Sequence, residues 1–288
     1  MSENFELSWD KIVFMLAILL IIANILKRPK EGFESIEHVE KTNKNLYDKF
    51  YAKIYDYLVF SEIRNKYEMG EIINQTHPTE KSVLLDIGCG TGNIVNEFKK
   101  QGYNITGVDE SQDMINISKK KYLLENLVKG NVMQSHLFPH YHFTHILCLY
   151  FTIYYMENKV LFFENVYDWL KPGGVFIVHL VNREKFSSTL PMNTFQRRKN
   201  GNVTKIPFQD FDYEARFELN KQMNTGFFYE KFKNHLGGSR KNVHRFFMED
   251  QKTILYLAQQ IGFIVEGKID MNPIKYDYQY LYILKKPY

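Results

Sequence analysis

The chain has 288 residues, which is enough for one large domain or for a domain with additions. Its 23 Phe and 20 Tyr residues can fill a substantial core, and a net charge of +4 does not by itself argue for an acidic partner. The two cysteines, Cys89 and Cys148, fall in predicted core segments, so we expect free thiols in a reducing compartment and no disulfide framework.

The amino-terminal segment contains an uncharged apolar run from Ile12 to Leu26. With Trp9 before it and the basic stretch 27–30 after it, this run predicts a short membrane helix. A secretory signal peptide is not favoured, because the preceding residues are acidic and no small-residue cleavage site follows. The charge bias predicts an anchor over residues 1–30, with the rest of the chain on the cytoplasmic side. A buried hairpin helix and an uncleaved targeting segment are the alternatives.

A polar segment and two helices are predicted next. Residues 31–45 are charged and aperiodic, and we interpret them as a linker. Aromatic residues then recur at helical spacing from Leu46 onward, and a second helix is predicted over residues 63–75. Tyr47 and Tyr51 lie one turn apart and can share a face, either packed on a sheet or turned toward a ligand.

The most specific motif is a glycine-rich turn after the apolar run 83–87. Asp86 lies in this run, and Gly88, Gly90 and Gly92 follow it before a helix-like segment. Such a turn at the end of a buried parallel strand predicts a nucleoside-cofactor pocket. A dinucleotide fingerprint has the spacing G-x-G-x-x-G, whereas this turn has G-x-G-x-G, so a nicotinamide oxidoreductase is not favoured.

Strands and helices alternate through the middle of the chain, which predicts a doubly wound, mostly parallel sheet. The expected strands are 83–87, 104–108, 126–129, 143–149 and 175–181, and the expected helices are 92–101, 112–124 and 160–170. The pattern then changes, and residues 182–250 are interpreted as a β-rich cap insertion. A helix over 248–261 and strands over 264–270 and 278–284 complete the predicted domain, 46–288.

Several motifs occur in the order found in one enzyme family. They are the Asp86–Gly92 turn, the acidic Asp109, the segment Ser111–Ile115, the turn Lys171–Gly174 and the closing segment Gln279–Pro287. In this order they resemble the class I S-adenosylmethionine (SAM)-dependent methyltransferases, of the small-molecule type. The resemblance implies a Rossmann-like, seven-stranded sheet with an antiparallel last strand, and SAM as the cofactor.

The resemblance also implies a set of cofactor-binding residues. Asp109 would accept hydrogen bonds from the ribose hydroxyls, Met114 would pack on the adenine, and Asn131 stands where the family often has Asp. Ordinary core packing is the alternative for Met114. The full expected set is Asp86, Gly88, Cys89, Gly90, Gly92, Asp109, Glu110, Met114, Asn131, Val132, Tyr150, Tyr47 and Tyr51.

No residue is singled out as catalytic. Methyl transfer from a sulfonium requires an aligned nucleophile and exclusion of water, and a general base is needed only when the nucleophile arrives protonated. The candidates at the pocket rim and in the cap are Tyr154, Tyr155, His179, Tyr229 and Arg245. We expect no metal site, because the spacing of His136, His140, His142 and His145 matches no standard ligand motif.

The leading hypothesis is a membrane-anchored methyltransferase with a small-molecule or lipid acceptor. Nucleic acid is not favoured, because Leu149–Thr152 stands where exocyclic-amine enzymes have [DN]-P-P-[YFW], and no Pro-Cys pair occurs. A catalytically silent SAM-binding scaffold at a membrane and a protein methyltransferase are the alternatives. The oligomeric state is left open.

Overall fold

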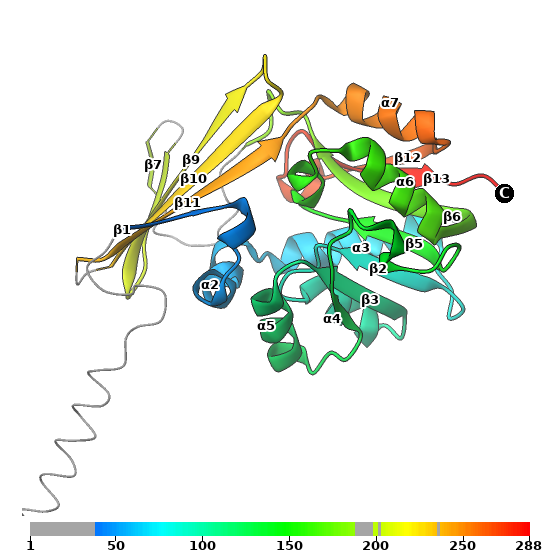
Figure 1. Ribbon diagram of the computed structural model, residues 1–288, viewed down its shortest axis with the longest axis horizontal. Helices are drawn as coiled ribbons and strands as arrows, with labels where there is room; N and C mark the ends of the chain where they lie inside the picture. The colour runs from blue at the N-terminus through cyan, green and yellow to red at the C-terminus, as the bar shows by residue number, and fades with distance from the viewer. Residues whose placement is uncertain (1–37, 188–197, 201–202, 235–236) are drawn as a thin grey trace, which may run out of the picture.

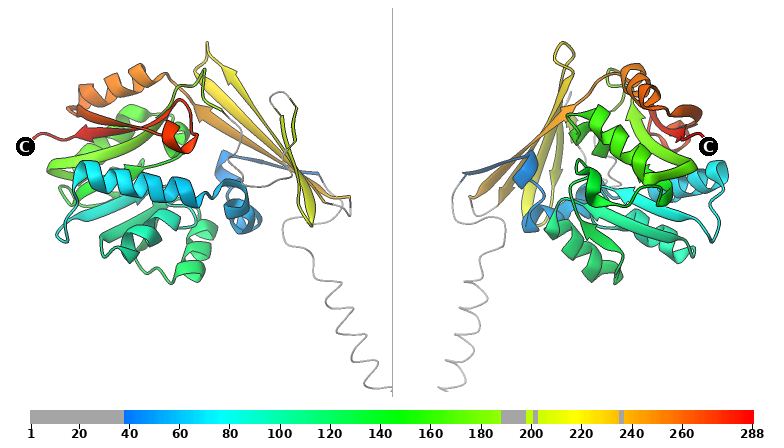
Figure 2. Two further views of the ribbon diagram at one scale, coloured as in Figure 1. Left: turned by 180° about the vertical axis from the view of Figure 1, so that it is seen from behind. Right: turned by 45° about the vertical axis from the view of Figure 1, so that its right-hand side comes forward.

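The molecule contains two β-sheets with a helix between them. The computed structural model describes residues 38–187, 198–200, 203–234 and 237–288. Figure 1 shows a seven-stranded sheet covered by helices, a separate six-stranded sheet beside it, and helix α2 (Lys49–Val59) between the two. The views in Figure 2 agree with this arrangement. We call the six-stranded sheet the cap sheet.

The seven-stranded sheet has the order β12-β13-β6-β5-β2-β3-β4. Neighbouring strands run parallel except at β13, which pairs antiparallel with both β6 and β12. The strands are β2 (Val83–Ile87), β3 (Asn104–Asp109), β4 (Leu127–Lys129), β5 (Phe143–Cys148), β6 (Leu170–Val181), β12 (Ile264–Asp270) and β13 (Gln279–Lys285). Leu84 of β2 lies opposite Ile105 of β3 and His145 of β5.

Helices cover both faces of this sheet, which explains why its strands are almost continuously apolar. They are α3 (Glu62–Thr76), α4 (Asn93–Lys100), α5 (Gln112–Tyr122), α6 (Lys159–Trp169) and α7 (Gln251–Ile261). Short 3-10 turns also occur, at η1 (Asn43–Asn45), η2 (Ser135–Leu137), η3 (Thr152–Tyr155) and η4 (Asn272–Ile274). Along β5, Ile146 and Cys148 pack with α6 and α7. Leu147 packs on the opposite face with α3 and α4.

The cap sheet has the order β1-β11-β10-β9-β8-β7. Its strands are β1 (His38–Thr42), β7 (Arg198–Asn200), β8 (Val203–Pro207), β9 (Phe211–Asn220), β10 (Thr225–Asn234) and β11 (Ser239–Phe247). All neighbours are antiparallel except β1, which is parallel to β11. On β10, Glu230 and Phe232 are buried on the inner face whereas Lys231 and Lys233 are exposed, as the alternation of a strand requires.

The predicted strands and helices between residues 46 and 181 and between 248 and 284 are confirmed, with end shifts of a few residues. Residues 38–42 differ, because this part of the predicted linker forms edge strand β1. An edge strand needs only one partner, so the polar sequence of β1 carries little of the apolar alternation that marks an inner strand. The turn 171–174 also lies within β6.

The predicted membrane span, residues 9–26, lies outside the described residues. Within the described ranges, no helix has both the length and the apolar character needed to cross a membrane.

The same substitution, glycine to alanine, is expected to have opposite effects on stability at Gly92 and at Gly70. Gly92 precedes α4 at φ +76°, and a Cβ there would lie 1.9 Å from Ser118 Oγ. We expect Gly92→Ala to lower the free energy of unfolding by about 1–3 kcal/mol, because it adds backbone strain and a clash. Gly70 lies inside α3 with no atom within 4 Å of its added Cβ, so Gly70→Ala should raise stability by about 0.5–1 kcal/mol. Urea denaturation measures both, and equal effects would contradict this expectation.

Candidate functional site

A cavity lies between the glycine turn, residues 88–92, and the inner face of the cap sheet. It holds about 1030 Å³ of space, including the open solvent at its mouth. Asp86 and residues 88–91 of the glycine turn form its floor, and Tyr47, Tyr51 and Tyr55 form one wall. The opposite side, which we call the aromatic roof, contains Phe217, Phe228 and Phe246. The cavity therefore joins the end of β2 to an apolar surface.

The glycine turn keeps its backbone open toward this cavity. Gly88 has φ +70° and Gly90 has φ +53°, a region that side chains disfavour. A Cβ on Gly90 would meet only the Tyr55 ring, at 3.8 Å, so it would project into the cavity. The turn is therefore a cradle in which a ligand can approach the backbone closely.

Asp109, at the end of β3, fastens the glycine turn. Its Oδ2 accepts a hydrogen bond from Gly90 N at 2.9 Å, and its Oδ1 accepts one from Ser111 N at 2.8 Å. Burial raises the pKa of Asp109 to about 6, although these two hydrogen bonds lower it. Each carboxylate oxygen has a second lone pair that can accept a hydrogen bond from a hydroxyl group.

The raised pKa of Asp109 predicts a pH dependence of cofactor binding. The family resemblance predicts that ribose hydroxyls donate to the ionised carboxylate of Asp109, so SAM binding should weaken as the pH falls through about 6, by up to about tenfold for each pH unit. Folding has the opposite sign for this group, because a raised folded-state pKa gives stability that is lost as the pH rises through about 6. Calorimetric titration with SAM across this range, compared with Asp109→Asn, measures the effect. An unchanged pH profile in Asp109→Asn would contradict it.

A second group of polar side chains, Arg64 and Glu68, also lines the cavity. Arg64 of α3 is buried, and among the described residues its Nε and Nη1 have no hydrogen-bond partner. Its guanidinium lies 4.3 Å from the centre of the Tyr150 ring, and its Nε lies 3.9 Å from Glu68 Oε2. Burial raises the pKa of Glu68 to about 7, although Arg64 opposes this. A buried cation with free donors is costly unless a ligand satisfies it.

These groups fit the methionyl end of SAM, which carries a carboxylate and an ammonium group. Arg64 offers unpartnered donors to the carboxylate. Asp86 faces the same cavity, and burial, Glu68 and Asp109 raise its pKa well above the usual range. An ammonium group is the partner that would favour the ionised form of Asp86. The residues present therefore match the charges of the expected cofactor.

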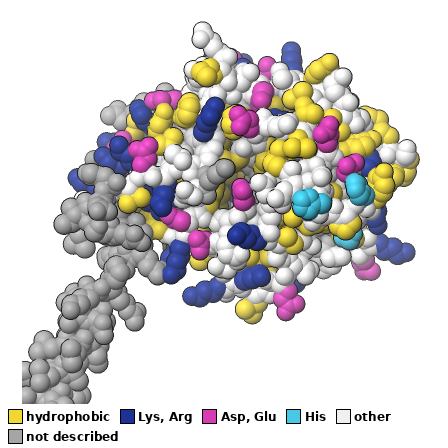
Figure 3. Space-filling model, in the orientation of Figure 1, with side chains coloured by type: hydrophobic (Ala, Val, Ile, Leu, Met, Phe, Trp, Pro, Cys, Tyr) yellow, Lys and Arg dark blue, Asp and Glu magenta, His cyan; other side chains and the backbone are white. Residues whose placement is uncertain are grey.

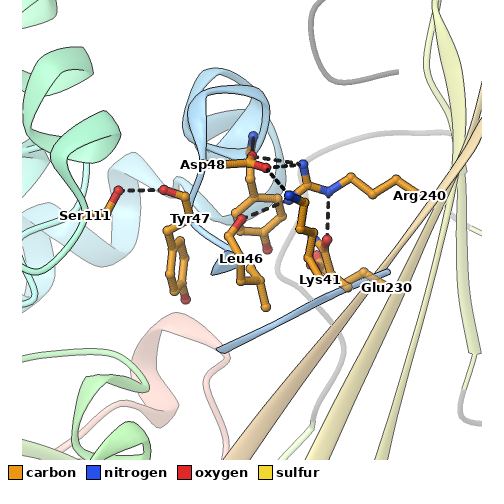
Figure 4. A network of polar contacts seen from close by, with 9 residues as sticks. Lys41, Leu46, Tyr47, Asp48, Ser111, Glu230 and Arg240 are labelled. Atoms are coloured by element: carbon orange, nitrogen blue, oxygen red, sulfur yellow. Dashed lines mark hydrogen bonds and ion pairs between the residues drawn. The ribbon is translucent and has the colours of Figure 1, made fainter. Parts of the chain in front are cut away.

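An ion pair between Arg240 and Asp48 ties the start of α2 to the cap sheet (Figure 4). Arg240 of β11 donates from Nη1 to both oxygens of Asp48, at 2.9 and 2.8 Å, and from Nη2 to the Leu46 carbonyl. Asp48 also caps α2 by accepting from Tyr51 N. On the other side of α2, the Ser111 hydroxyl donates to the Tyr47 carbonyl. The wall of Tyr47, Tyr51 and Tyr55 is thus connected both to the cap sheet and, through Ser111, to the segment that follows β3.

A chain of hydrogen bonds crosses the cavity wall into the cap sheet. The Tyr47 and Tyr155 hydroxyls lie 2.7 Å apart, and the Tyr155 hydroxyl lies 2.5 Å from His244 Nδ1. His244 Nε2 lies 2.8 Å from Glu230 Oε2. Burial raises the pKa of Glu230, but the His244 ring and hydrogen bonds from His244, Tyr213 and Asn242 outweigh burial, so this pKa lies below its usual value.

The predicted cofactor residues divide into two groups. The members that line the cavity are Tyr47, Tyr51, Asp86, Gly88, Cys89, Gly90 and Tyr150. The members outside its lining are Gly92, Asp109, Glu110, Met114, Asn131 and Val132. Met114 packs with Leu46 and Phe50 next to α2, and Asn131 Oδ1 accepts a hydrogen bond from Met133 N.

The five predicted catalytic candidates do not gather around the cavity. Tyr154 is buried, and its hydroxyl accepts from a backbone N–H of β6. His179 is buried against a backbone carbonyl, and burial lowers its pKa to about 4. Tyr229 and Arg245 alternate with inward-facing residues and lie on the outer face of the cap sheet. Of the five candidates, only Tyr155 lines the cavity.

Sequence reasoning missed Arg64, Glu68, Glu230 and His244. Glu230 and His244 occupy inner positions in strands whose other inner residues include Phe232 and Phe246. A charged or titratable residue at such a position is a signal that sequence reading can find. Arg64 gives no comparable signal, because polar residues are common on helix surfaces.

Comparison with known proteins gives a consistent result. The family profile described as "Methyltransferase domain" matches residues 85–178. The "Ubiquinone biosynthesis O-methyltransferase" of Rickettsia canadensis is 30% identical over 170 residues, which cover 57% of this chain and 67% of that protein. The protein of the same name from Rickettsia felis is 31% identical over 167 residues, which cover 57% and 65%. The chain thus spans about two thirds of the length of these relatives.

Solved structures show the same fold. A SAM-dependent methyltransferase from Clostridium acetobutylicum aligns with a TM-score of 0.64 at 21% identity, covering 85% of this chain and 100% of that one. A SAM-bound amino pentose methyltransferase from Micromonospora echinaspora aligns with a TM-score of 0.60 at 16% identity, covering 85% and 99%. At such identities the likeness establishes the architecture.

Proposed function

Because this chain belongs to the class I SAM-dependent methyltransferases, we propose that it methylates a small, largely apolar acceptor held between the glycine turn and the aromatic roof. The observation that carries the proposal is the continuous cavity, whose floor suits the cofactor and whose roof suits an apolar ring or chain.

The cofactor supplies a methyl group already activated on a sulfonium, so the protein chiefly binds, orients and excludes water. Arg64 would hold the methionyl carboxylate, and Asp86 would hold the ammonium group. Tyr47, Tyr51 and Tyr55 line the cavity, and their rings can stabilise the positive sulfonium by cation–π attraction. The aromatic roof then keeps water from the acceptor.

An aromatic hydroxyl is the acceptor class we favour. The two Rickettsia relatives carry names that place them in ubiquinone biosynthesis as O-methyltransferases, which supports such an acceptor. The roof residues Phe217, Phe228 and Phe246 offer ring edges and faces to an aromatic partner. Figure 3 shows charged side chains of both signs interspersed on the visible face, which gives no support to a nucleic-acid substrate.

An acceptor screen tests the proposal. Methyl-labelled SAM is offered with an alkylated catechol, dodecylamine, dodecanoate or a mixed protein fraction, and we expect label on the catechol. Phe228→Ala should raise the KM for the catechol, because it removes part of the roof, while Tyr256→Ala on the exposed face of α7 should not. SAM binding without any transfer would favour a silent scaffold, and label on protein would favour a protein methyltransferase.

We also propose that the domain is tethered to a membrane on its cytoplasmic side. Support comes from the sequence alone, in the uncharged run Ile12–Leu26 and the basic stretch 27–30. Such a tether would bring the cavity close to acceptors that partition into lipid. Release of the full-length chain from membranes by alkaline carbonate, without detergent, would contradict the tether, and a chain beginning at Lys30 serves as the soluble control.

A further inference from the structure

The relay Tyr47–Tyr155–His244–Glu230 connects the cavity to a fully buried carboxylate. Glu230 has a side-chain exposure of 0% and His244 of 4%. Glu230 accepts from Tyr213 through Oε1, and from Asn242 and the His244 ring through Oε2. With three donors, the carboxylate is stabilised in its ionised form.

This arrangement sets the direction of each hydrogen bond. An ionised Glu230 only accepts, so His244 Nε2 carries a proton and donates it. A neutral imidazole then has its lone pair on Nδ1, which faces the Tyr155 hydroxyl. Tyr155 donates to His244, and Tyr47 donates to Tyr155. The hydroxyl oxygen of Tyr47 is left as an acceptor at the cavity wall. The backbone carbonyl of the same residue accepts a hydrogen bond from the Ser111 hydroxyl.

We propose that His244 is the proton acceptor for methylation of a hydroxyl group, reached through Tyr155 and Tyr47, with Glu230 as its positioning residue. This inference rests on the proposed function and assigns to the cap sheet a chemical role beyond that of an apolar cover. It also selects hydroxyl acceptors, because these must lose a proton during transfer whereas a neutral amine attacks with a free lone pair.

The proton and electron balance is complete within these groups. The acceptor hydroxyl gives its proton to the Tyr47 oxygen, Tyr47 gives its own to Tyr155, and Tyr155 gives its own to His244 Nδ1. The acceptor oxygen forms a bond to the methyl carbon while the carbon–sulfur bond breaks, and that electron pair stays on sulfur. The imidazolium, paired with Glu230, later returns its proton to solvent.

The groups that face His244 favour this role. Glu230 approaches from β10, Tyr155 from η3, Tyr51 from α2, and Tyr47 from the segment just before α2. The nearest cation of the same network is Arg240, which reaches Glu230 only through Asn242 and is neutralised by Asp48. An imidazolium at His244 would therefore contact a carboxylate directly, and its hydrogen bonds within the described ranges join it to Glu230 and Tyr155 and not to a cation.

The test compares two acceptors in wild type and in Glu230→Gln. With catechol, whose hydroxyl is protonated, we expect kcat to fall by about 100-fold or more in the variant and the acidic limb of the pH profile to change. With nitrocatechol, which is already ionised at neutral pH, the variant should stay within about threefold of wild type. The dissociation constant for SAM should be the same in Glu230→Gln as in wild type, with either acceptor present.

A second pair of variants distinguishes loss of the relay from a general loss of folding. Tyr155→Phe breaks the relay by removing one hydroxyl, and Tyr229→Phe makes the same change on the outer face of β10, next to Glu230. We expect Tyr155→Phe to reproduce the selective loss with catechol and Tyr229→Phe to resemble wild type. NMR of histidine-labelled protein should find the His244 proton on Nε2.

Three results would overturn the relay. They are an equal loss with catechol and nitrocatechol, a proton on His244 Nδ1, and methylation of dodecylamine alone. SAM binding without turnover of any acceptor would instead overturn the proposed function, so the two failures are distinguishable.

Discussion

Arg64→Met is expected to raise the dissociation constant for SAM by at least about 30-fold. Truncating one partner of a buried, hydrogen-bonded charge pair costs about 2–5 kcal/mol, and the methionyl carboxylate would lose its cation. The fold should survive, because methionine fills similar space and Glu68, with a pKa already near about 7, can take up a proton once Arg64 is removed. Isothermal titration calorimetry measures the constant.

Two controls separate carboxylate binding from general damage. Methylthioadenosine lacks the amino-acid end of SAM, so its affinity should change by less than about twofold in Arg64→Met. Lys66→Met lies on the same helix, but its side chain is 62% exposed, and it should alter SAM binding very little. Equal losses for SAM and methylthioadenosine would contradict the assignment of Arg64.

Asp48→Asn is expected to destabilise the protein by about 3–5 kcal/mol, more than Arg240→Met does. The asymmetry follows from burial, since the Arg240 side chain is 2% exposed and that of Asp48 is 31% exposed. Removing the carboxylate leaves a buried guanidinium without its counter-charge, which is the costly case. When Arg240 is removed, the Asp48 carboxylate is still stabilised by solvent and by Lys41, whose Nζ lies 3.7 Å from Oδ2.

Denaturant unfolding of both variants and of the double variant measures this expectation. Asn keeps an oxygen that can cap α2, so the loss in Asp48→Asn reports the charge and not the cap. The double variant should be more stable than Asp48→Asn alone, because it no longer contains an unpaired buried charge. Additive losses, or a larger loss in Arg240→Met, would contradict the argument.

Local sequence patterns predicted the α/β domain well because its signals are local. The apolar run 83–87 and the three glycines after it need particular backbone geometry, and that requirement is written in consecutive residues. The parallel sheet followed from the alternation of strands and helices, and its antiparallel last strand followed from the resemblance of the closing segment to that of a known family. The linker prediction missed β1, whose pairing with β11 joins residues about 200 positions apart.

The candidate site was harder to predict because its residues come from distant segments. Tyr155 follows β5, while His244 and Glu230 lie on neighbouring cap strands. Nothing in the sequence around His244 indicates that a tyrosine hydroxyl from η3 reaches it. Tyr229 and Arg245 were chosen for their chemistry, but strand alternation places them on the outer face, next to the inward-facing Glu230 and His244.

The sequence by itself determined the fold class and a nucleoside-cofactor pocket, because the glycine turn and the order of strands and helices are specified by short-range backbone and packing requirements. The identity of the cofactor as SAM followed from the resemblance of the ordered motifs to a known family. Only the tertiary structure decided which side chains surround the cavity. The sites of Arg64 and His244 depend on how α3, η3 and the cap sheet pack together, and such packing brings together residues that no local pattern relates. The chemistry of the acceptor end is therefore a property of the assembled fold.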